Sequence, residues 1–345
     1  MIIHIAPATV FLPKFIEAIN RNFSHQRHVF FLSNHLLTED LVGGSKIFLE
    51  PVSIFRKIPY FLNLITKLVR SDRIILHGLF DPKVWLLFFL LPFAVKKSCW
   101  VIWGSDLYSH KFNNTTWKHK IREFLKTRII SNLHSMITYL DGDYRNAVKW
   151  YGSRATHIEC LMYDSNVFSF KPPTKASDTS KIRVIVGNSA DPTNCHLDVF
   201  KKLQLINDPR LEIYCPLSYG DEQYRDFVIS TGRDIFGKNF FPLTELLPIN
   251  DYIEFLSNAD IGIFNHPFQQ AMGNIINLLG LNKKVFLREN TSQWELFNKL
   301  GVGIFSVDEL TYENIFHATV NNNQLIRDNF SESGYLLQLK EVFRT

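Results

Sequence analysis

Residues 182–194 read Ile-Arg-Val-Ile-Val-Gly-Asn-Ser-Ala-Asp-Pro-Thr-Asn, and the interpretation of the whole chain starts from them. A run of mostly β-branched residues leads into a Gly-Asn-Ser loop, and a helical pattern follows from about His196. A strand that ends in such a loop and opens a helix presents free backbone N–H groups to an anion beyond the carboxyl edge of its sheet. By itself, the same loop is also compatible with an ordinary turn. The rest of the sequence is therefore needed to distinguish a turn from an anion-binding loop.

Strand-like and helix-like segments alternate on both sides of this stretch. The front half predicts strands at residues 2–6, 28–33, 73–77, 99–103 and 136–139, and helices at 12–22, 54–69, 116–130 and 141–150. The back half predicts strands at residues 183–186, 211–215, 261–264, 285–287 and 303–305, and a last helix at 333–343. Strands that alternate with helices in this way indicate parallel sheets with helices on both faces.

The polar, proline-bearing residues 165–181 have the composition of a linker. We therefore predict an α/β chain of GT-B architecture, with two Rossmann-like parallel-sheet domains that face a central cleft. The predicted boundaries are 1–168 for the first domain, 169–181 for the linker and 182–330 for the second domain. Residues 331–345 would form a C-terminal helix, for which packing back on the first domain is one option.

The composition is that of a folded globular protein, with 46% apolar and 14% aromatic residues among 345. The four cysteines show no C-x-x-C spacing, so we expect reduced thiols of a cytosolic protein and no metal site. Residues 1–6 predict a strand and not a signal peptide. The apolar run 84–95 contains Pro92 and is too short to cross a bilayer, and we expect a buried helix there in preference to one that dips into a membrane.

Positive charge is concentrated in the front half of the chain. Residues 1–165 contain 21 Lys and Arg against 12 Asp and Glu, a balance of +9, whereas the remainder has a balance of −4. This asymmetry indicates an anionic partner for the front half, although a solvated basic surface would give the same count. We expect no nucleic-acid partner, because no recognisable RNA- or DNA-binding motif accompanies the basic residues.

Ligands of open α/β sheets lie beyond the carboxyl ends of the strands, where five motifs of this chain are predicted. Two of them supply candidates for the base that accepts a proton from an attacking hydroxyl group. Asp106 follows a Trp-Gly-Ser turn and is the first candidate, with a helix cap as its alternative. His77 is the second candidate because its pKa is near neutrality, and it could instead hydrogen-bond the loop that holds Asp81.

The back-half motifs supply candidate ligands for a nucleotide sugar. Gly187, Asn188 and Ser189 could bind phosphate, Asn194 could bind or cap a helix, and Tyr219 could stack on a base. The helix that starts near Gly273 would direct its N-terminus at a diphosphate. Side chains that could supplement it with hydrogen bonds or charge are Gln269, Gln270, Asn274, Arg288 and Glu289, where Arg288 and Glu289 could instead form an ion pair with each other.

Five motifs in order carry a resemblance to a known family. They are His-Gly-Leu-Phe-Asp-Pro-Lys-Val-Trp at 77–85, Trp-Val-Ile-Trp-Gly-Ser-Asp-Leu-Tyr at 100–108, Val-Gly-Asn-Ser-Ala-Asp-Pro-Thr-Asn at 186–194, Gln-Gln-x-x-Gly at 269–273 and Leu-Arg-Glu-Asn at 287–290. Together they resemble glycosyltransferase family 56, the TDP-acetamidofucose:lipid-linked disaccharide transferases of enterobacterial surface polysaccharide synthesis. The match spans about residues 74–295. The family has Asn at the place of Asp81, which argues against Asp81 as an indispensable base.

The resemblance implies a hexosyltransferase-type enzyme that uses a dTDP-4-acetamido-4,6-dideoxygalactose donor. The acceptor would be a polyprenyl-diphosphate-linked oligosaccharide of enterobacterial common antigen or of an O-antigen, at the cytoplasmic face of the bacterial inner membrane. The first domain would then be the acceptor and membrane side, and the second would bind the nucleotide sugar. No cleft-facing loop has an Asp-x-Asp, so we expect a metal-independent enzyme without a cofactor.

The helix predicted at 116–130 is the expected contact with an anionic membrane, although a soluble helix would have the same pattern. The residues assigned to the acceptor and membrane side are Asp81, Tyr108, Trp117, Lys118, Arg122 and Lys126. Two alternatives remain from the sequence: a sugar-nucleotide epimerase of the same architecture and a non-catalytic membrane-binding module. The acceptor and the stereochemical outcome stay open.

Overall fold

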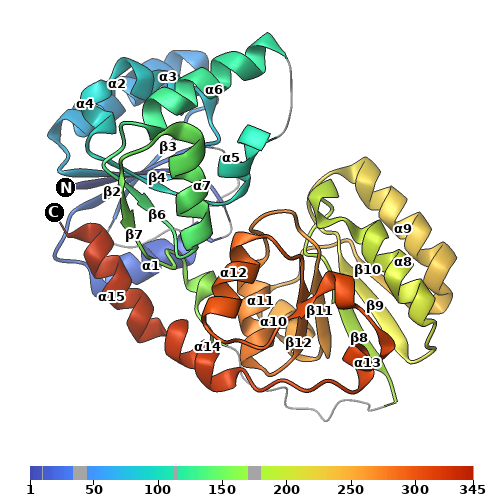
Figure 1. The fold of residues 1–345 in the computed structure, drawn as a ribbon. Coiled ribbons are helices and arrows are strands. Elements are labelled where there is room, and N and C mark those ends of the chain that lie inside the picture. Colours follow the sequence, from blue (N-terminus) through green and yellow to red (C-terminus); the bar gives the residue numbers. More distant parts are fainter. Residues whose placement is uncertain (10, 34–44, 112–115, 170–179, 345) are drawn as a thin grey trace. The chain divides into compact units, whose positions relative to one another are not determined.

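The computed structural model describes residues 1–9, 11–33, 45–111, 116–169 and 180–344 of the chain. It divides into two compact units (Figure 1). Unit 1 contains residues 1–165 together with 333–345, and unit 2 contains residues 166–332. Each unit is a parallel β-sheet covered by helices, which is the α/β class that the alternating pattern predicts.

The sheet of unit 1 has seven strands in the order β3-β2-β1-β4-β5-β6-β7, and every described pairing is parallel. The order in which strands are added reverses between the neighbouring strands β1 and β4. In doubly wound sheets, ligands bind beyond the carboxyl ends of the strands at such a point. The strands are β1 (Ile2–Pro7), β2 (His28–Ser33), β3 (Lys46–Leu49), β4 (Arg73–His77), β5 (Ser98–Val101), β6 (Ser135–Ile137) and β7 (Thr156–Ile158).

Two helices, α1 (Leu12–Asn22) and α15 (Glu332–Phe343), cover one face of this sheet. Their side chains Phe15 and Phe343 both pack edge-on against the ring of His4 in β1. The opposite face carries the helices that connect strands in the other direction, as right-handed crossovers require (Figure 1). These are α2 (Ile54–Arg70), α3 (Pro82–Leu90), α4 (Pro92–Val95), α6 (Trp117–Ile130) and α7 (Asp141–Tyr151).

The apolar run 84–95 does not form the single buried helix that the sequence predicts. Helix α3 ends at Leu90, and α4 begins at Pro92, because a proline has no N–H to continue the hydrogen-bond ladder. Only one side of each helix packs on the sheet, where Trp85, Phe88, Ala94 and Val95 are buried. The other side is exposed, and it consists of Leu86, Phe89, Leu90 and Phe93.

Unit 2 repeats the design with six parallel strands in the order β10-β9-β8-β11-β12-β13. The order in which strands are added to the sheet reverses between β8 (Ile182–Val186) and β11 (Ile261–Phe264), which are parallel neighbours. The other strands are β9 (Leu211–Pro216), β10 (Phe240–Leu243), β12 (Lys284–Leu287) and β13 (Phe305–Ser306). Strand side chains such as Val184 and Ile213 pack against Phe200 of α8 (His196–Ile206) to form the core.

Local sequence signals set the helix ends of both units. Asp81 and Thr291 cap α3 and α12 (Ser292–Lys299) by accepting hydrogen bonds from backbone N–H groups of the first turn. Gly152, with φ of +62°, ends α7 in the left-handed conformation. The remaining helices of unit 2 are α9 (Glu222–Phe236), α10 (Ile249–Ser257), α11 (Met272–Gly280), α13 (Tyr312–Phe316) and α14 (Asn323–Asn329). Within the described ranges, no helix is long and apolar enough to cross a membrane.

Candidate functional site

The loop after β8 lies at the point of unit 2 where the strand order reverses. Gly187 has a φ of +71°, and a Cβ atom there would lie 2.5 Å from His196 Nε2 and 2.6 Å from Asn194 Oδ1. Only glycine fits this position without displacing those side chains. The loop therefore comes close to its neighbours because residue 187 has no side chain.

Asn194 holds this loop together and is fully buried. Its Oδ1 accepts hydrogen bonds from the Asn188 backbone N–H (2.8 Å) and lies 2.9 Å from His266 Nε2, and its Nδ2 donates to Ser189 Oγ (3.1 Å). The helix-cap alternative is wrong, because Asp191 and Cys195 are the N-cap residues of the neighbouring helices, whereas a contact between Asn194 and the donor stays a prediction. The amide orders the Gly-Asn-Ser loop and ties the end of β8 to the segment after β11.

Helix α11 begins at the same edge of the sheet, and no side chain of the described residues caps its first N–H groups. Ala271, the residue before it, has a φ of +57°, and Ile275 N–H donates to Ala271 C=O (3.0 Å). Gly273 lies in this first turn, where the sequence places it. Gln270 flanks the turn by donating from Nε2 to Thr193 Oγ1 (2.6 Å). An uncapped helix start of this kind attracts an anion.

Several buried polar atoms at this edge have no hydrogen-bond partner among the described residues. Buried polar groups in native proteins are almost always paired, so such atoms mark a place where a ligand or water completes the bonding. The atoms are Asn188 Oδ1, His196 Nε2, His266 Nδ1, Gln269 Oε1 and Gln293 Nε2. They belong to the loops after β8, β11 and β12 or to the helices that follow them.

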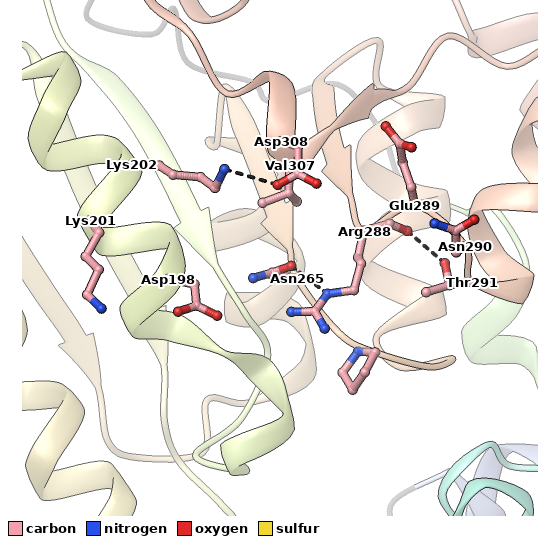
Figure 2. Close-up of a pocket in the computed structure, with 11 residues that line it drawn as sticks. Asp198, Lys201, Lys202, Asn265, Arg288, Glu289, Asn290, Thr291, Val307 and Asp308 are labelled. Carbon is pink, nitrogen blue, oxygen red and sulfur yellow. Dashed lines mark hydrogen bonds and ion pairs between the residues drawn. The ribbon is translucent and has the colours of Figure 1, made fainter. Parts of the chain in front are cut away.

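A hollow of about 710 Å³ extends along this edge between α8 and the segments after β11, β12 and β13 (Figure 2). The guanidinium group of Arg288 lies in it, and its Nε donates to Asn265 Oδ1 (2.9 Å). Among the described residues, Arg288 forms no ion pair, so its charge is available to an anionic ligand, contrary to the alternative of a pair with Glu289. Lys202 is paired with Asp308 at 3.1 Å on the other side of the hollow.

The remaining back-half candidates have defined positions. Tyr219 is half exposed, and its hydroxyl group accepts a hydrogen bond from Asn188 Nδ2 (2.9 Å). Asn274, in the first turn of α11, donates to the Tyr252 hydroxyl group (2.7 Å). Glu289 is exposed and lines the hollow. Ser189, the last residue of the Gly-Asn-Ser loop, is buried.

In unit 1, Asp106 is fully buried and does not face a ligand. Its Oδ1 accepts from the backbone N–H groups of Trp103 and Leu107, and its Oδ2 accepts from Leu79 N–H and Trp100 Nε1 at 2.8–3.0 Å. Burial raises the pKa of this carboxyl, and the donors partly offset that effect. In this structure the carboxylate is enclosed by these four donors and orders the loops around it, and its role as the catalytic base stays a prediction.

His77 is also fully buried, at the end of β4. Its Nε2 lies 3.0 Å from His4 Nδ1, and its Nδ1 lies 2.6 Å from the Tyr163 hydroxyl group. His4 Nε2 in turn lies 2.9 Å from His28 Nδ1, so three imidazole rings cross strands β4, β1 and β2 as one chain. Burial lowers the pKa of His77 to about 3. Both ring nitrogens therefore have protein partners in this structure, and the role of His77 as a base stays a prediction.

The other front-half candidates separate into buried and exposed groups. Tyr108 is buried and donates to Asp143 Oδ1 (2.8 Å). Lys126 is fully buried and donates to the backbone carbonyl of Asp106, so its ammonium group is not on the surface where the predicted membrane contact would lie. Arg122 stacks over the Trp85 ring at 5.2 Å. Trp117 is 67% exposed and Lys118 is exposed, whereas Asp81 caps α3.

The sequence analysis missed some site residues. Thr193, His266, Gln293 and Tyr252 enter the unit 2 site through side-chain contacts between segments far apart in the chain. His266 follows β11 and could have been found by the same strand-end argument that selected the other motifs. Within the described ranges, no group of three or more His, Cys, Asp or Glu side chains could hold a metal ion.

Comparison with solved structures identifies the class of fold. The chain matches Anabaena HepE in complex with UDP and glucose with a TM-score of 0.72 and 14% identity, over 99% of each chain. It matches the lipopolysaccharide outer core galactosyltransferase WaaB with a TM-score of 0.64 and 13% identity, over 99% of this chain and 98% of that one. It matches WaaG, a glycosyltransferase involved in lipopolysaccharide biosynthesis, with a TM-score of 0.62 and 9% identity, over 99% of this chain and 93% of that one. At these identities the likeness is one of fold, and the two doubly wound sheets are those of the GT-B fold.

The family follows from the sequence itself. The model of glycosyl transferase group 56, described as 4-alpha-L-fucosyltransferase, matches residues 60–341. The chain belongs to this family and is a glycosyltransferase. Membership confirms the resemblance carried by the five strand-end motifs.

Proposed function

We propose that the protein transfers 4-acetamido-4,6-dideoxygalactose from its dTDP donor to a polyprenyl-diphosphate-linked oligosaccharide of bacterial surface polysaccharide synthesis. Family membership over residues 60–341 supports the sugar class. Two solved structures of similar fold, WaaB and WaaG, belong to lipopolysaccharide synthesis by their descriptions, which supports the pathway class. Enterobacterial common antigen and an O-antigen remain the two candidate products.

The observation that carries the proposal is the set of groups suited to an anion or a sugar at the carboxyl edge of unit 2. They are the first-turn N–H groups of α11, the Arg288 guanidinium, which forms no ion pair among the described residues, and Gln269 Oε1, which has no hydrogen-bond partner there, and they suit a diphosphate with an attached sugar. HepE, which has the same fold, has been solved with UDP-glucose. A nucleotide sugar is therefore the ligand class that we assign to the carboxyl edge of unit 2.

Each group has a defined task in the transfer. As the bond between the anomeric carbon and the diphosphate breaks, negative charge grows on the leaving oxygen. Arg288 and the α11 N-terminus would stabilise that charge, while Gln269 would orient the sugar. In unit 1, Asp106 and His77 would hold the loops at the carboxyl edge in place, so their contribution is to the shape of the acceptor site.

The acceptor lipid implies a location at the cytoplasmic face of the bacterial inner membrane, as a peripheral protein. The exposed side chains Trp117 and Lys118 of α6 support a contact with an anionic surface, because an indole ring and an ammonium group both suit the headgroup region.

Calorimetric titration in the presence of a chelator tests the donor assignment. We expect wild-type protein to bind dTDP more tightly than UDP or GDP. Arg288→Ala removes a charge-assisted hydrogen bond worth about 1.5–3 kcal/mol, so dTDP affinity should fall by at least about tenfold. Arg233→Ala, an exposed arginine of α9, is the matched control and should bind as wild type does. Equal affinity for the three nucleotides would contradict the proposed donor.

A further inference from the structure

The helices on one side of unit 1 carry many large apolar side chains that are exposed to solvent. We call this set the apolar face. The most exposed members are Phe55 (83%) in α2 and Val52 (79%), which lies just before that helix. The set is Val52, Ile54, Phe55, Ile58, Leu62, Val69, Leu86, Phe89, Leu90, Phe93, Trp117, Ile121 and Phe124. Monomeric proteins seldom expose so many neighbouring apolar groups without a binding partner.

The helices α2, α3, α4 and α6, which carry most of these side chains, lie on the same side of the sheet (Figure 1). The rings of Phe89 in α3 and Phe124 in α6 are in contact, with centroids 6.1 Å apart. Buried Glu50 links α2 to α3, because its Oε1 lies 3.2 Å from Lys57 Nζ and 2.7 Å from Lys83 Nζ.

Helix α2 shows why this face is not part of the core. Leu64 and Leu68 are buried and attach α2 to unit 1. The residues Phe55, Ile58, Leu62 and Val69 are spaced by three, four and seven positions, which places them on one other side of the helix. The apolar arc of α2 is thus wider than the sheet can cover. The exposed apolar side of α2 would be stabilised by contact with an apolar environment outside unit 1.

The charged residues near the apolar face indicate which kind of partner could bind to it. Between residues 52 and 124, the span of the apolar face, the chain has twelve Lys and Arg and four acidic residues, Asp72, Asp81, Asp106 and Glu123. Asp106 is buried, and Asp81 lies 4.0 Å from Lys83. A second copy of this chain would bring the same positive charge against it. The occupant that fits is both apolar and anionic.

We infer that the apolar face docks on an anionic lipid bilayer, with α2 and α3 seated at the boundary between headgroups and acyl chains. This deepens the proposed function, since it names the surface through which the enzyme meets a lipid-linked acceptor. It also moves the principal contact away from α6, where the sequence alone placed it. Helix α6 contributes the flank, through Trp117, Ile121 and Phe124.

Vesicle co-sedimentation of the full chain tests the inference. The probes are vesicles of phosphatidylcholine alone and of phosphatidylcholine mixed with phosphatidylglycerol. We expect wild-type protein to bind the mixed vesicles, with an affinity that falls as salt is added. Phe55→Glu and Ile58→Glu should each weaken binding by about tenfold, because a charge replaces an inserted apolar group.

Leu205→Glu is the matched control, because Leu205 is 86% exposed on α8 of unit 2. Its binding to vesicles should equal that of wild type, and all three variants should keep the wild-type melting temperature. Failure of wild type to bind mixed vesicles overturns the inference, and so does full binding by Phe55→Glu. Concentration-dependent dimerisation that Phe55→Glu abolishes, without vesicle binding, would assign the face to contact between copies instead.

A transfer assay separates this inference from the proposed function. With a water-soluble, short-chain acceptor, Phe55→Glu should be as active as wild type, whereas with a long-chain acceptor in mixed vesicles it should be slower by the same factor as its loss of binding. If neither protein transfers sugar to either acceptor, the proposed function fails while vesicle binding still stands. Equal loss on both acceptors would overturn the docking role of Phe55.

Discussion

At the scale of single residues, unit 1 is distinguished by its three linked histidines. Each neutral imidazole ring has one N–H, so a chain of rings is satisfied only when every ring donates in the same direction. Phe15 and Phe343 enclose His4 from two helices, and the Tyr163 hydroxyl group meets the far end of the chain. The chain therefore depends on all three rings remaining neutral.

This dependence predicts a loss of stability on acidification. Burial lowers the pKa of His28 to about 4 from its ordinary 6.5, with further lowering from the N-terminal ammonium group and His25. Because the unfolded chain binds the proton more readily, the stability contributed by neutral His28 is present above pH 6.5 and is lost as the pH falls toward 4. The free energy of unfolding should decline by about 1.4 kcal/mol per pH unit from this residue. Urea unfolding at several pH values between 7 and 4.5 measures it.

The variant His28→Gln isolates that contribution from the carboxyl groups. It should be less stable than wild type at pH 7, because the bond to His4 changes, yet its stability should decline less steeply between pH 6 and 4.5. Parallel curves for the two proteins would show that His28 is already protonated in the folded state or that it titrates alike in both states.

At the scale of elements, the loop after β8 matters more than any single ligand in it. Gly187, Asn194 and His266 come from the ends of β8, η3 (Pro192–Asn194) and β11, and they fit together only with the loop in its present path. The N–H groups of the loop and of α11 are directed by this packing. A ligand site built on backbone groups is therefore sensitive to small displacements of the loop.

Gly187→Ala tests this sensitivity. The left-handed backbone costs about 1 kcal/mol with any side chain, and the new Cβ would also displace His196 and Asn194. We expect a lower melting temperature and dTDP binding weakened by about tenfold in calorimetry. Gly301→Ala is a close control, since Gly301 has a φ of +70° with open space around it. It should lose some stability and bind dTDP normally, and equal binding by both variants would contradict the loop's role.

At the scale of the whole molecule, the last helix of the chain completes the first unit. Tyr335, Leu339, Val342 and Phe343 of α15 are buried in unit 1. The Phe343 ring lies edge-on to those of Phe23 and His28, with centroids 5.0 and 4.8 Å away. Stability of unit 1 therefore depends on residues that follow the whole of unit 2 in the sequence.

Phe343→Ala should lower the stability of unit 1 by about 3–5 kcal/mol, the usual cost of removing a buried aromatic ring. Hydrogen exchange resolves which unit is affected. Amides of β1, β2 and β4 should lose protection, whereas those of β8 and β11 should exchange as in wild type. Leu337→Ala, at an exposed position of the same helix, should change neither set. Equal loss of protection in both units would mean that they unfold as one.

The sequence by itself determined the class of fold and the family. Strands composed mostly of apolar residues, such as β1, β8 and β11, are buried along most of their length, and this local pattern is sufficient to predict them. It missed β3, β7 and β10, each at the edge of a sheet, because edge strands are short and half exposed. The strand-end motifs identified family 56 for the same reason that they mark the site: their residue types are constrained by loop geometry.

Only the tertiary structure decided what the motif residues do. Asp106, His77, Asn194 and Lys126 have the residue types of a catalytic or binding site, yet all four are buried within hydrogen-bond networks. The sequence patterns of α2 and α3 likewise indicate that both helices are apolar, but they do not indicate which side of each helix packs against the sheet. Burial and exposure are set by contacts between segments distant in the chain, and local sequence patterns contain no record of those contacts.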